Sequence, residues 1–311
     1  MTAIYYHDLF GRHLAGYRHV ESPARYEAVM RRLRTGSLAG RLEFVEARRA
    51  DTSWIEAVHD SEYVEGILSL EIEDAVILDW GDTVATPDTP EAAMYAAGAS
   101  VQATRDVLEG RAAGAFCPVR PPGHHAERGR AMGFCIFNNI AIAAAWLLGE
   151  GGLDRVAVVD WDVHHGNGTE RIFMEDSRVL YVSLHQFPHY PGTGHHNMTG
   201  TGAGTGYTLN IPLGPGAGDD IYRREFAGRV IPALDGFAPQ FVLISAGFDA
   251  HAEDPLSGAL LSTGMYGEMT EMIMESAAKH CPGRIVSLLE GGYDLELLAD
   301  CVEAHVGVLS A

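Results

Sequence analysis

The chain has 311 residues, of which 47% are hydrophobic, and this is enough for one large core or two modest ones. The 42 acidic and 22 basic residues leave a formal net charge of −20, which opposes binding to nucleic acid or anionic membranes and mildly favours cationic substrates or partners. The alternative is that this charge serves solubility alone. No linker-like or repetitive segment divides the sequence, so we expect one domain over residues 1–311.

Short apolar runs alternate with longer helical patterns along the chain. Strands are predicted at 2–6, 114–119, 155–159, 179–184, 241–246 and 284–289, and helices at 23–34, 53–59, 91–109, 136–148, 219–234, 263–280 and 295–309. Most of the strands are continuously apolar, which is typical of parallel strands that helices cover on both faces. The alternation therefore favours an α/β fold with an open parallel sheet and helices on both faces.

Polar side chains of catalytic types follow four of the predicted strands. The segment 114–119 leads into "RPPGHHAE", and the segment 155–159 runs into "DWDVHHGNG". The segment 241–246 is followed by "GFDAH", and the segment 284–289 by "EGGYD". In open parallel sheets ligands bind beyond the carboxyl ends of the strands, so we expect a functional site at this edge.

Asp162 and His164 are candidate metal ligands. Alternation along an extended segment places residues two apart on one side, so these two side chains can converge. Asp249 is the best-placed third ligand. Two oxygens, one nitrogen and an open position are typical of catalytic Zn²⁺. The alternative for Asp162 and His164 alone is an ion pair or a capping arrangement.

His124 and His125 follow a rigid proline-glycine turn, a context that can place imidazoles accurately. A histidine beside the metal can act as general base and then as general acid. It then needs an acceptor on its other nitrogen, and Asp160 and Asn167 are polar groups of the right kind. Tyr293 can donate a hydrogen bond to an oxyanion, or it can be an ordinary packed tyrosine.

The remaining features indicate a cytoplasmic protein. The N-terminus lacks the pattern of a signal peptide, and the apolar run 140–148 is too short to span a bilayer. The four cysteines have no CxxC spacing, so we expect reduced thiols. The glycine-rich stretch 192–206 lacks the Gly-Lys-Ser/Thr of a phosphate-binding loop, and we assign it no role.

Together these segments resemble the histone deacetylase superfamily, which includes class II deacetylases, bacterial deacetylase-like amidohydrolases and acetylpolyamine amidohydrolases. The resemblance is carried by "VRPPGHHAE", "GFCIFNNIAIAA", "VDWDVHHGNGT", "SLHQFPHYPGTG", "SAGFDAHAEDPLSG" and "LLEGGYD". These motifs cover nearly the whole chain in family order. Two features resemble class II enzymes. One is the "HHAE" motif, and the other is Asn167, at a position where class I enzymes carry an aspartate.

The resemblance implies an arginase-like fold and a Zn²⁺ ion bound by Asp162, His164 and Asp249. It makes His125 the main base and acid, with His124 in support and oriented by Asp160. The remaining implied residues have other roles: Tyr293 polarises the amide carbonyl, the Gly133 carbonyl accepts the amide N–H, and Phe134 and Tyr190 flank a channel for an acyl-lysine stem. It also implies two structural K⁺ sites, one formed by Asp160, Asp162, His164, Ser183 and Leu184, and one by Phe173, Asp176, Val179 and Tyr207.

The sequence departs from the family pattern at three places. Asn167 cannot ionise, so His125 lacks a second carboxylate partner. The loop "DWGDTVATPDT" shows no aspartate where class I enzymes hold the substrate backbone; Asp82 and Asp88 are only neighbours. Tyr190 replaces a phenylalanine that is common on one channel wall.

The expected function is hydrolysis of an acyl-lysine peptide, an acyl-lysine protein or a related acylated amine. An acetylpolyamine deacetylase is the first alternative, but polyamine-selective relatives carry a glutamate where this chain has Leu256. A protein that binds acyl-lysine without hydrolysing it is the second alternative. We expect neither nucleic acid nor a membrane as a partner.

Overall fold

The centre of the fold is an eight-stranded sheet whose paired strands all run parallel. The computed structural model describes residues 1–79, 81 and 83–311. From one edge to the other the strands are β2 (Leu42–Glu46), β1 (Thr2–Tyr6), β5 (Gly114–Cys117), β10 (Ile285–Leu289), β9 (Phe241–Ala246), β6 (Val156–Asp160), β7 (Val179–Gln186) and β8 (Thr208–Leu213). The expected α/β class with an open parallel sheet is thus confirmed.

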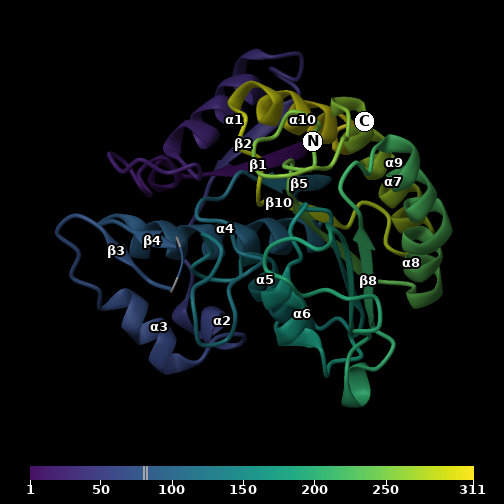
Figure 1. Ribbon diagram of the computed structural model, residues 1–311, viewed down its shortest axis with the longest axis horizontal. Helices are drawn as coiled ribbons and strands as arrows, with labels where there is room; N and C mark the ends of the chain where they lie inside the picture. The colour runs from purple at the N-terminus through teal and green to yellow at the C-terminus, as the bar shows by residue number, and fades with distance from the viewer. Residues whose placement is uncertain (80, 82) are drawn as a thin grey trace.

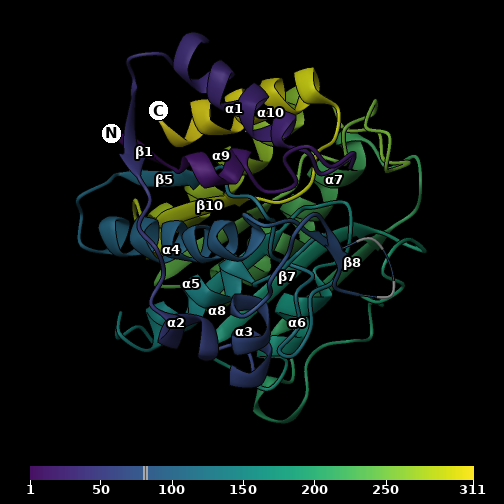
Figure 2. The same ribbon diagram turned by 90° about the vertical axis from the view of Figure 1, so that its left-hand side faces the viewer.

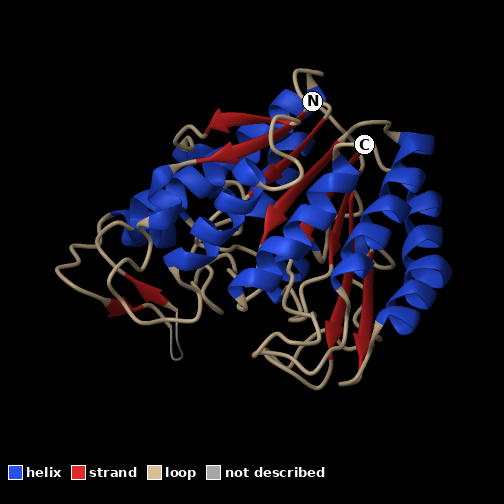
Figure 3. Ribbon diagram, turned by 90° about the horizontal axis from the view of Figure 1, so that it is seen from above, coloured by secondary structure: helices blue, strands red, loops and turns tan. Residues whose placement is uncertain are grey.

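Helices cover both faces of the sheet (Figures 1 and 3). Figure 2 shows α1 (Pro23–Thr35), α9 (Thr263–His280) and α10 (Leu295–Leu309) on one side of the central strands, and α4 (Thr89–Leu108) and α5 (Asn139–Leu148) on the other. The central strands β5, β6, β9 and β10 are buried along their whole length. Burial on both faces explains why their sequences are continuously apolar.

Shorter elements complete the chain. They are α2 (Thr52–Glu56), α3 (Ser61–Leu68), α6 (Asn167–Phe173), α7 (Asp219–Glu225), α8 (Ile231–Phe237), a π-helical turn (Phe226–Val230), the 3₁₀ turns Asp8–Gly11 and Gly202–Gly204, and the antiparallel pair β3 (Val76–Ile77) and β4 (Val84–Ala85). No helix in the described part of the chain is long and apolar enough to cross a membrane. The four cysteines are buried and unpaired.

Two of the elements that the sequence did not reveal are the edge strands of the main sheet, and the others include the short helices α3 and α6 and the pair β3 and β4. The edge strand β2 carries the exposed residues Glu43 and Glu46, and the edge strand β8 contains Pro212. Neither strand is a continuous apolar run, because an edge strand has only one neighbour and tolerates such residues. The predicted helix 136–148 begins at Asn139 instead, because the side chain of Asn138 caps it by accepting a hydrogen bond from the Ala141 N–H at 3.1 Å.

The predicted helix 219–234 is also corrected. It is divided into α7, the π-helical turn and α8. The helical pattern of apolar residues continues through the turn, so the periodicity alone did not reveal the extra residue of the π-turn.

The sheet order places the candidate residues together. Strands β5, β10, β9 and β6 are consecutive neighbours in the sheet. Each is followed by one of the polar segments that the sequence singled out. Their carboxyl ends therefore lie side by side at one edge, where the loops converge on a single cavity.

Candidate metal and catalytic site

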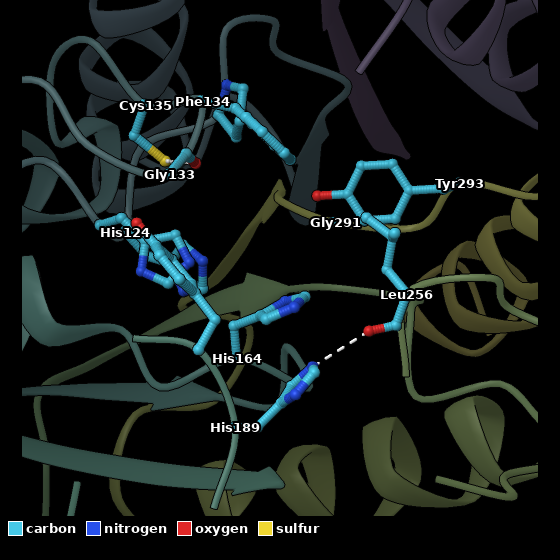
Figure 4. A pocket seen from close by; sticks show the side chains of 12 residues that line it. His124, Gly133, Phe134, Cys135, His164, His189, Leu256, Gly291 and Tyr293 are labelled. Atoms are coloured by element: carbon cyan, nitrogen blue, oxygen red, sulfur yellow. Dashed lines mark hydrogen bonds between the residues drawn. The ribbon is translucent and has the colours of Figure 1, made fainter. Parts of the chain in front are cut away.

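The loops after the central strands enclose a cavity of about 250 Å³ (Figure 4). Loop residues that follow β5, β6, β7, β9 and β10 all contribute to its wall. The lining residues are Pro122, His124, His125, Gly133, Phe134, Cys135, His164, His189, Tyr190, Leu256, Gly291 and Tyr293. A concave site with apolar walls and a few convergent polar groups is a typical small-molecule site.

Asp162, His164 and Asp249 come together at the cavity. The Nδ1 atom of His164 lies 3.1 Å from a carboxylate oxygen of Asp162 and 3.1 Å from one of Asp249. One possible ligand atom from each of the three lies within 4.8 Å of the others, and all three residues are buried. Asp162 and His164 follow β6 and Asp249 follows β9, so neighbouring strands deliver the set.

The electrostatics of the three residues are those of a cation site. Burial opposes a charge on His164, but hydrogen bonds to the two carboxylates outweigh it and raise its pKa to about 10. Burial and the nearby Asp162 raise the pKa of Asp249. Two buried carboxylates that share one histidine are poorly compensated without a further positive charge.

The backbone around the carboxylates fixes their orientation. The Gly291 N–H donates to Asp162 at 2.7 Å, and the Val163 N–H donates to Asp249 at 2.9 Å. In each carboxylate the other oxygen faces His164. A Cβ atom at residue 291 would overlap both carboxylates, which explains the glycine there. The oxygen–oxygen–nitrogen donor set fits a borderline divalent cation such as Zn²⁺.

The two adjacent histidines have different partners. The Nδ1 of His124 lies 3.0 Å from a carboxylate oxygen of Asp160, and the Nδ1 of His125 lies 2.8 Å from the amide oxygen of Asn167. Burial opposes a charge on His124, but Asp160 and Asp162 outweigh it and raise its pKa to about 10. Burial, followed by the positive charges of His124 and His164, lowers the pKa of His125 well below its usual value. The pair therefore combines a cation with a neutral imidazole.

Glu290 anchors the histidine loop, and sequence reasoning gave it no role. Its carboxylate accepts hydrogen bonds from the N–H groups of Gly123 and His124, at 2.7 and 3.1 Å, and from the Ser245 hydroxyl at 3.0 Å. Burial raises its pKa to about 7. Glu290 is the first polar residue after β10, and that position was the available signal.

A tight turn forms the wall nearest His125. Met132 and Cys135 exchange backbone hydrogen bonds, and the two residues between them, Gly133 and Phe134, have φ angles of 55° and 69°. Glycine is required at 133 because a Cβ there would overlap the His125 ring. The Gly133 carbonyl is 3.3 Å from the Cys135 thiol. The turn brings Phe134 to the cavity wall, despite a φ that side chains rarely adopt.

Tyr293 lies across the cavity from the histidines. Figure 4 shows its hydroxyl pointing into the space bounded by His124, Phe134 and His164. Its ring centroid is 6.1 Å from that of Phe134, edge to face. Burial raises the pKa of the Tyr293 phenol well above its usual value, so the phenol remains a hydrogen-bond donor at neutral pH.

Tyr190 and Leu256 lie on the other walls of the cavity. The centroids of the Tyr190 and His125 rings are 5.2 Å apart, and the two rings are nearly perpendicular. Sequence reasoning missed His189. Its ring stacks on that of His164, with the two centroids 4.9 Å apart, and its Nε2 lies 3.0 Å from the Leu256 carbonyl oxygen. His189 thereby connects the loop after β7 to the Leu256 loop (Figure 4).

The residues of the two expected K⁺ sites lie near β6 and β7. Asp160 pairs in register with Ser183, which precedes Leu184 in β7. Phe173 ends α6, Val179 begins β7 and Tyr207 precedes β8. The Asp176 carboxylate accepts two hydrogen bonds from the Arg178 side chain, at 3.0 and 2.6 Å.

The loop "DWGDTVATPDT" is described in part. Asp82 lies outside the described residues. Asp88 directly precedes the first residue of α4, and it is not one of the residues that line the cavity. Phe134 reaches this loop through its N–H, which donates to the Thr83 hydroxyl at 3.0 Å.

Comparisons with known proteins agree on one family. The model of the histone deacetylase domain matches residues 19–309. A probable deacetylase of Archaeoglobus fulgidus is 41% identical over 95% of this chain and 82% of its own length. A histone deacetylase-like amidohydrolase of Pseudomonas aeruginosa is 39% identical over 94% of this chain and 78% of its own. The crystal structure of the HDA15 HD domain superposes with a TM-score of 0.93 at 37% identity, covering 99% of this chain and 90% of that one.

Proposed function

The chain belongs to the histone deacetylase family, and we propose that it is a zinc-dependent amidohydrolase that removes acetyl or other short acyl groups from lysine-type amines. The family membership supports a deacetylase or amidohydrolase. The observation that carries the finer proposal is the buried Asp162–His164–Asp249 cluster, whose His164 lines the same cavity as His125 and Tyr293.

Asp162, His164 and Asp249 would hold the cation, which when bound supplies Lewis-acid polarisation of the scissile carbonyl and of the attacking water. His125 is neutral and takes a proton from that water through Nε2, and then returns it to the departing amine. His124, held as a cation by Asp160, stabilises the negative charge that develops. The Tyr293 phenol donates a hydrogen bond to the oxygen on which this negative charge develops.

The walls of the cavity suit an acyl-lysine. Phe134 and Tyr190 present aromatic rings along which an apolar methylene stem can pack. The Gly133 carbonyl would accept the N–H of the amide. The net charge of −20 attracts a substrate whose other groups are cationic.

Two further functions are the alternatives. An acetylpolyamine deacetylase would use the same chemistry on a small free cation, and Leu256 at the cavity opposes it because leucine offers no charge to a second ammonium. A non-enzymatic acyl-lysine binder would not need the cluster of acid, base and metal ligands. The two K⁺ sites and a cytoplasmic location stay predictions.

The test is a panel of acetyl-lysine peptides, longer acyl-lysines and acetylated polyamines, assayed with and without added Zn²⁺. We expect amide hydrolysis that requires the metal and falls sharply in Tyr293→Phe. Tyr17→Phe, at an exposed tyrosine, is the matched control. Metal-independent activity, or Tyr293→Phe at the wild-type rate, would contradict the proposal.

A further inference from the structure

The Asn167 side chain lies between His125 and Glu127. Its oxygen lies 2.8 Å from the His125 Nδ1, and its nitrogen donates to a Glu127 carboxylate oxygen at 2.9 Å. We propose that Glu127 is a positioning residue that holds the Asn167 amide with its oxygen toward His125 and thereby keeps the His125 proton on Nδ1. The catalytic consequence rests on the proposed function, whereas the tautomer itself does not.

The orientation of the amide matters because a carboxamide has two different ends. If the Asn167 amide turned over, its NH₂ group would face the His125 Nδ1, and only the tautomer protonated on Nε2 could accept that hydrogen bond. His125 would then lose the Nε2 lone pair with which it takes a proton. An aspartate at this position would present an acceptor oxygen in either orientation.

The surroundings of the amide nitrogen favour one orientation. Besides Glu127, the nitrogen lies 3.4 Å from the His125 carbonyl oxygen and 3.5 Å from the Met132 sulfur. All three neighbours are acceptors, but only Glu127 is charged and at the distance of a strong hydrogen bond. Glu127 is therefore the main determinant of the orientation of the Asn167 amide.

Glu127 is itself held in place and kept ionised. Arg130 donates to its two oxygens at 3.0 and 3.1 Å, and Arg171 donates at 2.9 Å. Burial opposes the charge, but the hydrogen bonds from Arg130, Arg171 and Asn167 outweigh it and lower the pKa of Glu127. Arg171 lies on α6, whose first residue is Asn167. The same helix thus supplies the amide and one of the cations that hold its partner.

The direct test is the tautomer of His125 in metal-free protein labelled with ¹⁵N-histidine. The His125 signals are identified by their loss in His125→Ala. In the wild type we expect a protonated Nδ1 and an unprotonated Nε2. In Glu127→Ala we expect signals of the Nε2–H tautomer to appear. Glu91→Ala is the matched control, because Glu91 also binds an arginine through both carboxylate oxygens but lies in the first turn of α4, outside the cavity lining.

Kinetics supply a second readout. Glu127→Ala should lower kcat by about tenfold to about a hundredfold with little change in KM, as is typical when a partner of an acid–base group is removed. In an Asn167→Asp background the same substitution should no longer lower kcat, because aspartate needs no orienting partner. A purely structural role for Glu127 would lower kcat in both backgrounds.

If Glu127→Ala does not fold, Glu127→Gln preserves the shape, and part of the same change is expected because its NH₂ can face Asn167. An unchanged His125 tautomer in the folded variant, or equal losses of kcat in both backgrounds, would overturn the inference. A wild type without amidase activity would instead count against the proposed function, and the tautomer measurement would still decide the role of Glu127.

Discussion

Asp160 holds His124 as a cation, through a contact of 3.0 Å between its carboxylate and the His124 Nδ1. The Asp160 carboxylate also accepts from the Tyr181 hydroxyl at 3.1 Å and from the Asp162 N–H at 3.1 Å. These donors leave it little freedom to move. A fixed positive charge beside His125 disfavours a second one, and the neighbouring histidine therefore stays neutral.

The first prediction is that the two histidines contribute unequally to turnover. His125→Ala should abolish detectable turnover, because it removes the group that takes and returns the proton. His124→Ala should slow turnover strongly but leave residual activity, because it removes charge stabilisation alone, and loss of one such group costs on the order of a hundredfold to a thousandfold. Steady-state kcat, with metal content verified, measures both. Equal residual rates would contradict these assignments.

The second prediction concerns the metal. Purified protein should contain about one divalent ion per chain, measured by elemental analysis. The double variant Asp162→Ala, Asp249→Ala should lose it, because two of the three donors are gone. Asp235→Ala, whose aspartate binds Lys279 on the surface, is the control and should keep the ion. Undiminished metal in the double variant would exclude these residues as the ligands.

The third prediction concerns Glu290, whose carboxylate is the acceptor for two backbone N–H groups and a hydroxyl. Glu290→Ala would remove that acceptor and leave the buried N–H groups of Gly123 and His124 without a partner. We expect the free energy of unfolding to fall by about 1–3 kcal/mol and kcat to fall because the histidine loop shifts. Ser245→Ala removes only one of the three donors and should cost less in both measurements. The reverse order would show that Glu290 does not anchor the loop.

Much of the site was predictable because its residues directly follow apolar strands. Asp162 and Asp249 lie within a few residues of the ends of β6 and β9, which are neighbours in the sheet. The carboxyl ends of parallel strands lie at the same edge of the sheet, and this does not depend on the conformation of the loops. The residue types and this placement were therefore sufficient to propose a metal site.

The contacts between loops were not predictable in the same way. Glu290 reaches Gly123, and Glu127 reaches Asn167, across segments that are far apart in the chain. Such contacts depend on loop conformations, and no hydrophobic periodicity encodes them. His189 is a similar case, because its adjacency to Tyr190 in sequence does not reveal that it stacks on His164. The edge strands β2 and β8 were not predicted because they lack continuous apolar runs.

The fourth prediction concerns stability against pH. Burial lowers the pKa of His305 from 6.5 to about 3, and the neutral ring contacts the Thr270 and Ser287 hydroxyls at 2.6 and 2.8 Å. Between those two pH values the unfolded chain binds a proton that the folded chain does not. The stability contributed by neutral His305 is therefore complete above pH 6.5 and is lost as pH falls toward 3.

Urea unfolding at two pH values tests this sign. Between about pH 7.5 and about pH 5.5, the free energy of unfolding should fall by about 1.4 kcal/mol more in the wild type than in His305→Gln, because glutamine does not titrate. Comparing the two proteins cancels the contributions of other groups. His280→Gln, on a partly exposed histidine that contacts Asp235, is the control. An equal pH dependence of wild type and His305→Gln would show that His305 is not held neutral.

The last prediction concerns substrate choice. Leu256 lies in the cavity wall, and its carbonyl contacts His189 while its side chain presents no charge. We therefore expect a higher kcat/KM for acyl-lysine substrates than for acetylspermidine or acetylputrescine. Leu256→Glu should shift the preference toward the polyamine, since a charge pair in a partly desolvated mouth contributes roughly 1–3 kcal/mol, or about ten- to a hundredfold.

Leu256→Gln is the matched control for this substitution, because it has the size of glutamate without its charge. Since the net charge of −20 attracts every cationic substrate, the ratio of kcat/KM values should be compared at low and high salt. A shift that arises from the local pair should be larger for Leu256→Glu than for Leu256→Gln at both salt concentrations. If the wild type prefers acetylpolyamines at every ionic strength, the lysine assignment is wrong, while metal-dependent amide hydrolysis would still stand.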